Sequence, residues 1–178
     1  MIADKYVGRG SVLLKIYFAG PDVFRGGYPA FKARVVDMCQ GRGLVPVFPG
    51  DEVTGSDPVA IFQDNLALID EADAVVANLN PFRGPEPDSG TAFEMGYAHA
   101  RGKLILGYID QFESTVDRVE RLQGHLMRYG NEITDRDGYR VEDFGLPLNI
   151  MLAVPTRLVA GSVEDCLNQL QQPVMSGT

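Results

Sequence analysis

The chain has few residues that could serve a metal or a redox centre. Its two cysteines, Cys39 and Cys166, lie far apart and outside any CxxC or histidine-rich context. Its two histidines, His99 and His125, show no metal-ligand spacing. We therefore expect no bound metal, and two reduced structural cysteines in a cytoplasmic protein.

Long apolar runs and basic clusters are also missing. No apolar run approaches the roughly 20 residues that span a bilayer, and residues 1–11 are polar with charges of both signs, unlike a secretory signal. The formal net charge of -8 argues against a nucleic-acid polymer as partner, because phosphate neutralisation requires clustered Lys and Arg. A nucleoside carries no phosphate and stays compatible with this charge.

Phosphate-binding glycine motifs are absent as well. Gly20-Pro21 follows an apolar run, but it fits neither the GxGxxG pattern nor a P-loop. This absence counts against a dinucleotide or triphosphate, and we expect no cofactor.

The length and composition are those of one globular domain. Hydrophobic residues make up 45% of the chain and charged residues 22%, which is ordinary, and 178 residues can bury a sizeable core. We treat residues 1–178 as a single domain with a flexible segment at 1–11, a hairpin-like insertion at 125–143 and a tail at 173–178.

Strand-like and helix-like segments alternate along the first 110 or so residues. Apolar runs predict strands at 12–19, 44–48, 72–79 and 104–109. Helical stripes and cap residues predict helices at 29–40, from Asp57-Pro58 onwards, and at 91–101. This alternation predicts an α/β fold, a flavodoxin-like or Rossmann-like sandwich with a mostly parallel sheet of about five strands.

After residue 109 the pattern is looser. We expect helices at 113–123, 148–153 and 162–172, and a hairpin within 128–143 that turns at Asp137-Gly138. Asp135, Asp137 and Glu142 are assigned to this hairpin, because the spacing of an EF-hand calcium loop is not met. The apolar patch at 146–152 is either core or a subunit contact, and composition favours core.

Two carboxylates after the third expected strand are the strongest chemical signal. Asp88 lies in a Gly/Pro-rich loop, and Glu94 follows six residues later near the start of a helix. This loop begins at the carboxyl end of the expected strand, which is where ligands of open α/β sheets bind. Paired carboxylates at such a place can break a glycosidic bond. Glu94 has a structural alternative, since Thr91 to Glu94 fits a capping box with Thr91 as N-cap. In the functional interpretation, the helix dipole keeps the Glu94 carboxylate ionised, and this carboxylate attacks an anomeric carbon to form an ester.

Neighbouring residues have similar alternatives. Asp88 either forms an Asx-turn or transfers a proton at a departing base. Tyr17 and Phe18 end the first strand and point to opposite faces, so either belongs to the core, and Tyr17 is also placed to hydrogen-bond the nucleophile. We expect Arg83 to fix its loop by pairing with Glu86 or Asp88.

Four stretches resemble the nucleoside 2-deoxyribosyltransferases. They are K-I-Y-F-A-G-P, I-F-Q-D-N-L-A-L-I-D-E-A-D-A-V-V-A-N-L, P-F-R-G-P-E-P-D-S-G-T-A-F-E-M-G-Y-A and V-E-D-F-G-L-P-L-N-I-M-L, in the family's order over roughly residues 13 to 160. D-S-G-T-A-F-E-M-G-Y-A is the most specific. The resemblance implies transfer of a 2-deoxyribosyl group between purine or pyrimidine bases, without phosphate or metal, in a homo-oligomer assembled from dimers.

The resemblance also implies roles for individual residues. Glu94 matches the family's nucleophile, Asp88 the residue that handles the proton at the base, and Tyr17 the tyrosine that orients the glutamate. Other matches give a substrate-binding set of Phe18, Gly20, Phe24, Asn65, Phe82, Asn149 and Met151.

Three of these matches have a stated role. Phe24 lines the base pocket. Asn65, which the helical pattern alone would place on a solvated face, matches a residue that contacts the base, and the alignment there is fixed to within one residue. Asn149, with Met151 nearby, reaches the sugar 5′-hydroxyl in a neighbouring subunit's site. This last match favours a subunit contact for the apolar patch.

Two other functions fit the same fold. A 2′-deoxynucleoside 5′-monophosphate hydrolase would need phosphate donors, for which Ser89 and Thr91 are available without any accompanying Lys or Arg cluster. A nucleotide-binding or sensor domain would use Glu94 only as a cap and would release its ligand unchanged.

Overall fold

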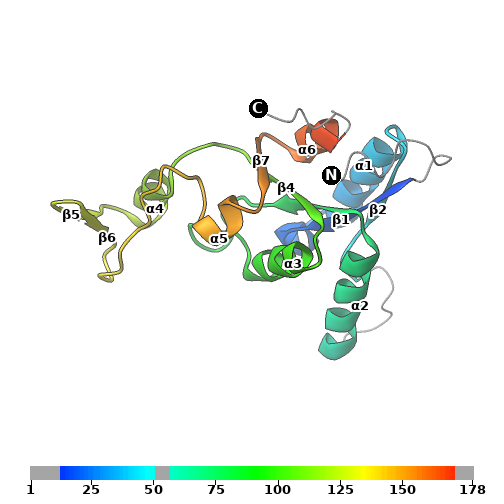
Figure 1. The fold of residues 1–178 in the computed structure, drawn as a ribbon, viewed down its shortest axis with the longest axis horizontal. Coiled ribbons are helices and arrows are strands. Elements are labelled where there is room, and N and C mark those ends of the chain that lie inside the picture. The colour runs from blue at the N-terminus through cyan, green and yellow to red at the C-terminus, as the bar shows by residue number, and fades with distance from the viewer. Residues whose placement is uncertain (1–12, 51–56, 171–178) are drawn as a thin grey trace.

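The centre of the molecule is a five-stranded parallel sheet with strand order β2-β1-β3-β4-β7 (Figure 1). The computed structural model describes residues 13–50 and 57–170. The strands of this sheet are β1 (Leu14–Ala19), β2 (Leu44–Val47), β3 (Ala74–Asn78), β4 (Leu104–Ile109) and β7 (Arg157–Ala160). The expected α/β fold with a parallel sheet of this size is therefore confirmed.

Helices cover both faces of the sheet. Their bounds are α1 (Tyr28–Gln40), α2 (Pro58–Glu71), α3 (Ser89–Ala100), α4 (Thr115–Gln123), α5 (Ile150–Ala153) and α6 (Val163–Leu170), with a 3₁₀ helix η2 (Pro21–Phe24) after β1. Helices α1 and α6 supply one apolar core, and α2, α3 and α5 supply the other. Helix α4 and the hairpin of β5 (Met127–Tyr129) and β6 (Glu132–Thr134) extend away from the sheet (Figure 1).

The sheet has its topological switch point between β1 and β3. From β1 the chain passes through α1 to β2 on one side, and from β3 it passes through α3 to β4 on the other. In sheets of this kind the connections diverge at such a point and leave a crevice at the carboxyl ends of the strands. The segments that leave this crevice are η2 and the loop that carries Asp88.

The alternation of side chains along β1 agrees with the expectation. Tyr17 is fully buried in the core formed with α2 and α3, whereas Phe18 lies in the core formed with α1 and α6. Successive residues of a strand point to opposite faces, so Tyr17 alone of this pair faces the helix that carries Glu94.

Strand β7 was missed by the sequence analysis. It is a four-residue edge strand that pairs only with β4 among the described strands. Pro155 precedes it and Arg157 begins it, so the segment lacks the continuous apolar run that marks the central strands. The helix before it is also shorter than expected, covering Ile150–Ala153.

The hairpin is present, and the expected turn at Asp137-Gly138 is one of two chain reversals in this region. Tyr129 pairs with Glu132, so the chain first reverses at Gly130-Asn131, which the sequence analysis missed. It reverses again at Asp137-Gly138, which places Arg140 opposite Thr134 in an antiparallel bridge. The Asp135 carboxylate stabilises this second turn by accepting hydrogen bonds from two backbone N–H groups. Glu142 lies outside the hairpin.

Both cysteines are free and buried. Burial raises the pKa of the Cys39 thiol to about 11 and that of the Cys166 thiol to about 12. The thiols therefore stay protonated at neutral pH and behave as small core residues, in line with the structural role expected for them. Within the described ranges, no helix is long and apolar enough to cross a membrane.

Candidate active site

Glu94 and Tyr17 meet at the carboxyl end of β1. The Tyr17 hydroxyl donates a hydrogen bond to Oε1 of Glu94 at 2.6 Å. Glu94 is the sixth residue of α3 and Tyr17 lies in β1, so this contact joins a helix and a strand that are 77 residues apart in the chain. Such a short bond to a carboxylate is charge-assisted and fixes the orientation of its acceptor.

The electrostatics of this pair depend chiefly on burial. Burial raises the pKa of Glu94 to about 7; the Tyr17 hydrogen bond opposes this shift and the charge of Asp88 adds to it. Burial, together with the charge and hydrogen bond of Glu94, raises the pKa of Tyr17 well above its ordinary value. Near neutral pH, Tyr17 is thus a permanent donor, and Glu94 exchanges between its neutral and ionised forms.

The capping interpretation applies to Asp88 instead of Glu94. Helix α3 begins at Ser89, and Oδ2 of its N-cap Asp88 accepts hydrogen bonds from the Thr91 backbone N–H at 3.0 Å and the Thr91 hydroxyl at 3.2 Å. The expected Thr91 cap was wrong by three residues. Glu94 accordingly lies in the second helical turn, where the helix dipole is weak, and the dipole does not keep it ionised.

Five of the expected site residues line one cavity of about 360 Å³. They are Gly20, Phe24, Asn65, Asp88 and Glu94, and the lining is completed by Val23, Pro49, Gly50, Ile61 and Gly90. Asn65 is held in place because its Oδ1 accepts a hydrogen bond from the Gly50 backbone N–H at 3.1 Å. The cavity therefore contains both carboxylates, an aromatic ring and an amide.

Gly20 allows the chain to turn sharply into this cavity. A Cβ atom at this position would lie 2.8 Å from Cβ of Asn78, and φ is 156°. Real Cβ atoms do not approach that closely, so a side chain would displace β3 or the start of η2. The close approach brings η2, and with it Phe24, against the end of the sheet.

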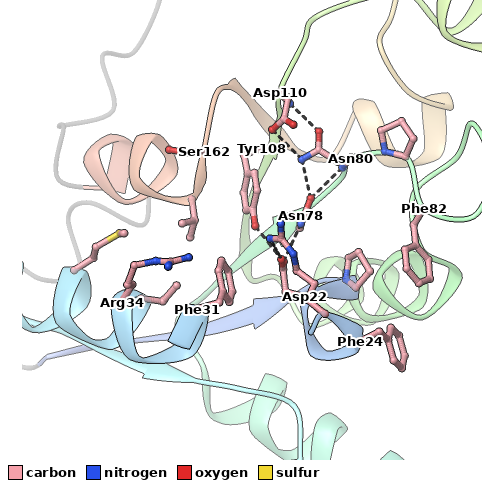
Figure 2. Close-up of a pocket in the computed structure, with 16 residues that line it drawn as sticks. Asp22, Phe24, Phe31, Arg34, Asn78, Asn80, Phe82, Tyr108, Asp110 and Ser162 are labelled. Carbon is pink, nitrogen blue, oxygen red and sulfur yellow. Dashed lines mark hydrogen bonds and ion pairs between the residues drawn. The ribbon is translucent and has the colours of Figure 1, made fainter. Parts of the chain in front are cut away.

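Asp22 anchors η2, a role that the sequence analysis missed. Its side chain is almost fully buried and accepts hydrogen bonds from Asn78 Nδ2 at 2.8 Å, Tyr108 hydroxyl at 3.3 Å and Arg25 Nη1 at 2.9 Å (Figure 2). The donors come from β3, β4 and the end of η2. In the sequence Asp22 follows a Gly-Pro pair and looks like an ordinary turn residue, so nothing local signals its burial.

Phe18 and Phe82 lie outside the cavity. Phe18 stacks on Phe48 in the opposite core, with ring centroids 5.2 Å apart. Phe82 stacks on Phe24, with centroids 5.8 Å apart, and lines a neighbouring cavity. Phe82 therefore contacts the site through Phe24, and Phe18 packs on the other face of the sheet.

Asn149 and Met151 are also absent from the lining of this cavity. Asn149 is the N-cap of α5; its Oδ1 accepts from the Met151 backbone N–H at 3.0 Å, and its Nδ2 donates to Glu142 at 2.7 Å. The Met151 side chain is 75% exposed. Their contribution to a neighbouring subunit's site stays a prediction.

A buried arginine supports the loop that carries Asp88. Arg118 is 3% exposed; it donates to the Pro85 carbonyl at 2.6 Å, pairs with Glu86 at 3.0 Å and also contacts the Pro147 carbonyl. In the sequence it resembles the exposed Arg121 of the same helix, so no local signal distinguishes the two.

The expected pairing of Arg83 was wrong. Glu86 pairs with Arg118, and no ion pair joins Arg83 to Glu86 or Asp88 in the part of the chain that the structure describes. The Arg83 guanidinium lies instead over the rings of Phe82 and Phe24.

The described residues contain no cluster of three or more His, Cys, Asp or Glu side chains that could hold a metal ion. The ionisable side chains gathered at this site are the two carboxylates and the tyrosine. A pair of carboxylates beside a pocket at the switch point of a parallel sheet is suited to cleavage of a glycosidic bond.

Comparison with known proteins identifies the family to which this chain belongs. The chain belongs to the nucleoside 2-deoxyribosyltransferase family, whose sequence profile it matches over residues 16–151. This confirms the resemblance carried by the four sequence stretches. Membership places the chain among enzymes that transfer or hydrolyse glycosyl groups, with nucleosides and nucleobases as the substrate class.

Individual relatives agree with this assignment. A 2-deoxyribosyltransferase from Leishmania mexicana is 39% identical, with a TM-score of 0.65, over 78% of this chain and 85% of that one. A conserved protein from Enterococcus faecalis shares the fold, at 22% identity and a TM-score of 0.57 over 90% of this chain and 99% of that one. The uncharacterized protein C191.05c of Schizosaccharomyces pombe is 28% identical over 83% of this chain and 79% of its own length.

Proposed function

We propose that the protein transfers the 2-deoxyribosyl group of a 2′-deoxynucleoside to another purine or pyrimidine base by a double displacement with retention of configuration. The observation that carries this proposal is the Tyr17–Glu94 hydrogen bond at a cavity also lined by Asp88. Tyr17 occupies Oε1 of Glu94, and no hydrogen bond to Oε2 is present within the described residues. Oε2 is therefore the nucleophilic oxygen.

In the first step, Oε2 of Glu94 attacks C1′ while the bond from C1′ to the base nitrogen breaks, through an oxocarbenium-like transition state. Asp88 gives its proton to the departing base. The product is a 2-deoxyribosyl ester of Glu94 and a free base.

In the second step, another base enters the vacated pocket and its nitrogen attacks C1′ from the same side. The ester bond breaks, the Glu94 carboxylate is regenerated, and Asp88 takes up the proton of the incoming base. Two inversions give net retention. Water that replaces the second base would hydrolyse the ester.

Phe24 and Asn65 are the proposed contacts of the base, since they line the cavity with both carboxylates. Gly20 allows close approach of the substrate. No cofactor enters this mechanism.

We further propose a homo-oligomer in which Asn149 completes a neighbouring site. Helix α3 lies next to both α2 and α5. These helices and the C-cap of α5 carry exposed large apolar side chains, namely Phe62, Phe93, Met151 and Val154, which are 45 to 76% exposed. The Phe62 and Phe93 rings lie 5.8 Å apart. Exposed apolar side chains gathered over adjacent helices are typical of an interface.

The test is a base-exchange assay with 2′-deoxyinosine and adenine in the absence of phosphate. The proposal expects 2′-deoxyadenosine from the wild-type protein and none from the Glu94→Ala variant. Release of hypoxanthine without 2′-deoxyadenosine would identify a hydrolase instead. Unchanged compounds, also with pyrimidine donors and 5′-monophosphates, would leave a binding domain.

A further inference from the structure

A second cavity adjoins the proposed active site. It has a volume of about 480 Å³ and opens on the α1 and α6 side of the sheet, above the Asp22, Asn78 and Tyr108 network (Figure 2). Its lining includes the apolar side chains of Phe31, Val35, Met38 and Val163. Phe24 lines this cavity and the Glu94 cavity alike, so the two cavities meet at this side chain.

Phe24 is held by a small stack of side chains. Its ring lies against Phe82 with an interplanar angle of 17° and a centroid distance of 5.8 Å. The Arg83 Cζ atom lies 4.7 Å from the Phe82 centroid and 5.6 Å from the Phe24 centroid. A guanidinium at such distances is attracted by the faces of aromatic rings. Phe24 is itself 63% exposed, so these two neighbours provide much of its support.

The backbone of Arg83 shows that this arrangement is imposed on the loop. Arg83 has a φ of 56°, and it is the one non-glycine residue with positive φ among those the structure describes. A bulky residue rarely adopts this conformation, and it persists where the surroundings over-determine it. Here the Phe82 N–H donates to the Glu86 carbonyl at 3.0 Å and Arg118 fixes Pro85 and Glu86. These contacts fix the loop on both sides of Arg83 and so hold its backbone in this conformation.

We propose that Phe24, Phe82 and Arg83 form a partition between the two cavities and that this partition limits the size of the base the enzyme accepts. The inference rests on the proposed function, which places the base against Phe24. With the partition in place, the base is confined to the Glu94 cavity. Without it, an apolar substituent on the base extends past position 24 into the second cavity.

The experiment compares adenine with N6-benzyladenine as the acceptor base, with 2′-deoxyinosine as donor. Phe24→Ala removes the ring at which the cavities meet, and Arg83→Gly removes the side chain whose guanidinium lies over that ring. Arg136→Ala, at an exposed arginine near the hairpin, is the matched control. The measured quantity is kcat/KM for N6-benzyladenine divided by kcat/KM for adenine.

We expect this ratio to be low in the wild-type protein and in the control. It rises about tenfold or more in Phe24→Ala, since filling or removing a small apolar group in a pocket changes kcat/KM by about 10- to 200-fold. It rises by a smaller factor in Arg83→Gly. The thermal midpoint of Arg83→Gly stays equal or increases, because glycine adopts positive φ without strain; a merely structural Arg83 would lower the midpoint on substitution and leave the ratio unchanged.

Calorimetric binding of the two bases to each protein, in the absence of a donor, tests the partition separately from the proposed function. If wild-type protein performs no base exchange, the proposed function fails, and the binding ratio still tests the partition. Equal use or equal binding of both bases by the wild-type protein would overturn the partition. So would an unchanged ratio in Phe24→Ala and Arg83→Gly.

Discussion

Substitution of Glu94 by Gln should make the protein more stable while abolishing its chemistry. The wild-type carboxylate is largely buried, and no cation is among the groups that shift its pKa. Ionisation of Glu94 therefore lowers the stability of the native state. Glutamine keeps the shape of the side chain and an oxygen that accepts from Tyr17, but it carries no charge at any pH.

The size of the effect follows from the pKa. Folding raises the pKa of Glu94 from its ordinary value of 4.5 to about 7, so ionisation destabilises the native state by about 3 kcal/mol, at about 1.4 kcal/mol for each pH unit. The native state binds the proton more tightly than the unfolded chain does. Wild-type stability is therefore lost progressively as the pH rises from about 4.5 through about 7, and the Gln variant does not show this loss.

Urea unfolding at about pH 5 and about pH 8.5 tests this linkage. At the lower pH the two proteins should differ by less than about 1 kcal/mol, and at the higher pH the variant should be more stable by about 3 kcal/mol. Glu132→Gln, at an exposed carboxylate of the hairpin, should show no such pH dependence. A difference that is the same at both pH values would refute the argument, as would base exchange by Glu94→Gln.

Three further substitutions probe the supports of the site. Tyr17→Phe removes the hydrogen bond that lowers the pKa of Glu94, so kcat should fall and the acid limb of the pH–rate profile should move to higher pH. Asp88→Asn should keep the helix, since Asn caps as well as Asp, but should lose proton transfer to and from the base. The same change at the N-cap of α2, Asp57→Asn, should leave activity intact in the exchange assay. Arg118→Met should lower the free energy of unfolding by about 1 to 3 kcal/mol, because the Pro85 and Pro147 carbonyls lose their charged donor, against at most about 1 kcal/mol for the exposed Arg121→Met.

The sequence predicted the architecture well where segments are long and strongly patterned. The central strands β1, β3 and β4 are continuous apolar runs because both of their faces are buried, and such runs are visible without tertiary information. Strand β7 lies at the edge of the sheet and is short, so its pairing with β4 depends on the rest of the fold. The turn at Asp137-Gly138 was visible in the local sequence, whereas the reversal at Gly130-Asn131, which joins the short strands β5 and β6, was missed.

The residues of the site were predicted more fully than their physical roles. Family resemblance identified Tyr17, Asp88 and Glu94, and alternation along β1 showed that Tyr17 and Phe18 face opposite ways. The N-cap of this helix was predicted three residues too late, which gave Thr91 the capping role that Asp88 has and placed Glu94 in the first turn. Asp22 and Arg118 were missed because their significance lies in burial, which no local pattern records for a polar residue between ordinary neighbours.

The corrected helix start also changes how the two carboxylates act together. The charge of Asp88 is one of the causes that raise the pKa of Glu94. In the reactive state of the proposed mechanism, the pair carries a single charge, because Asp88 holds the proton for the departing base and Glu94 is the free nucleophile. When the base leaves with the proton, Asp88 becomes charged at the same moment that Glu94 becomes a neutral ester. Each step therefore leaves about one negative charge in the cavity, which avoids the repulsion of two buried carboxylates.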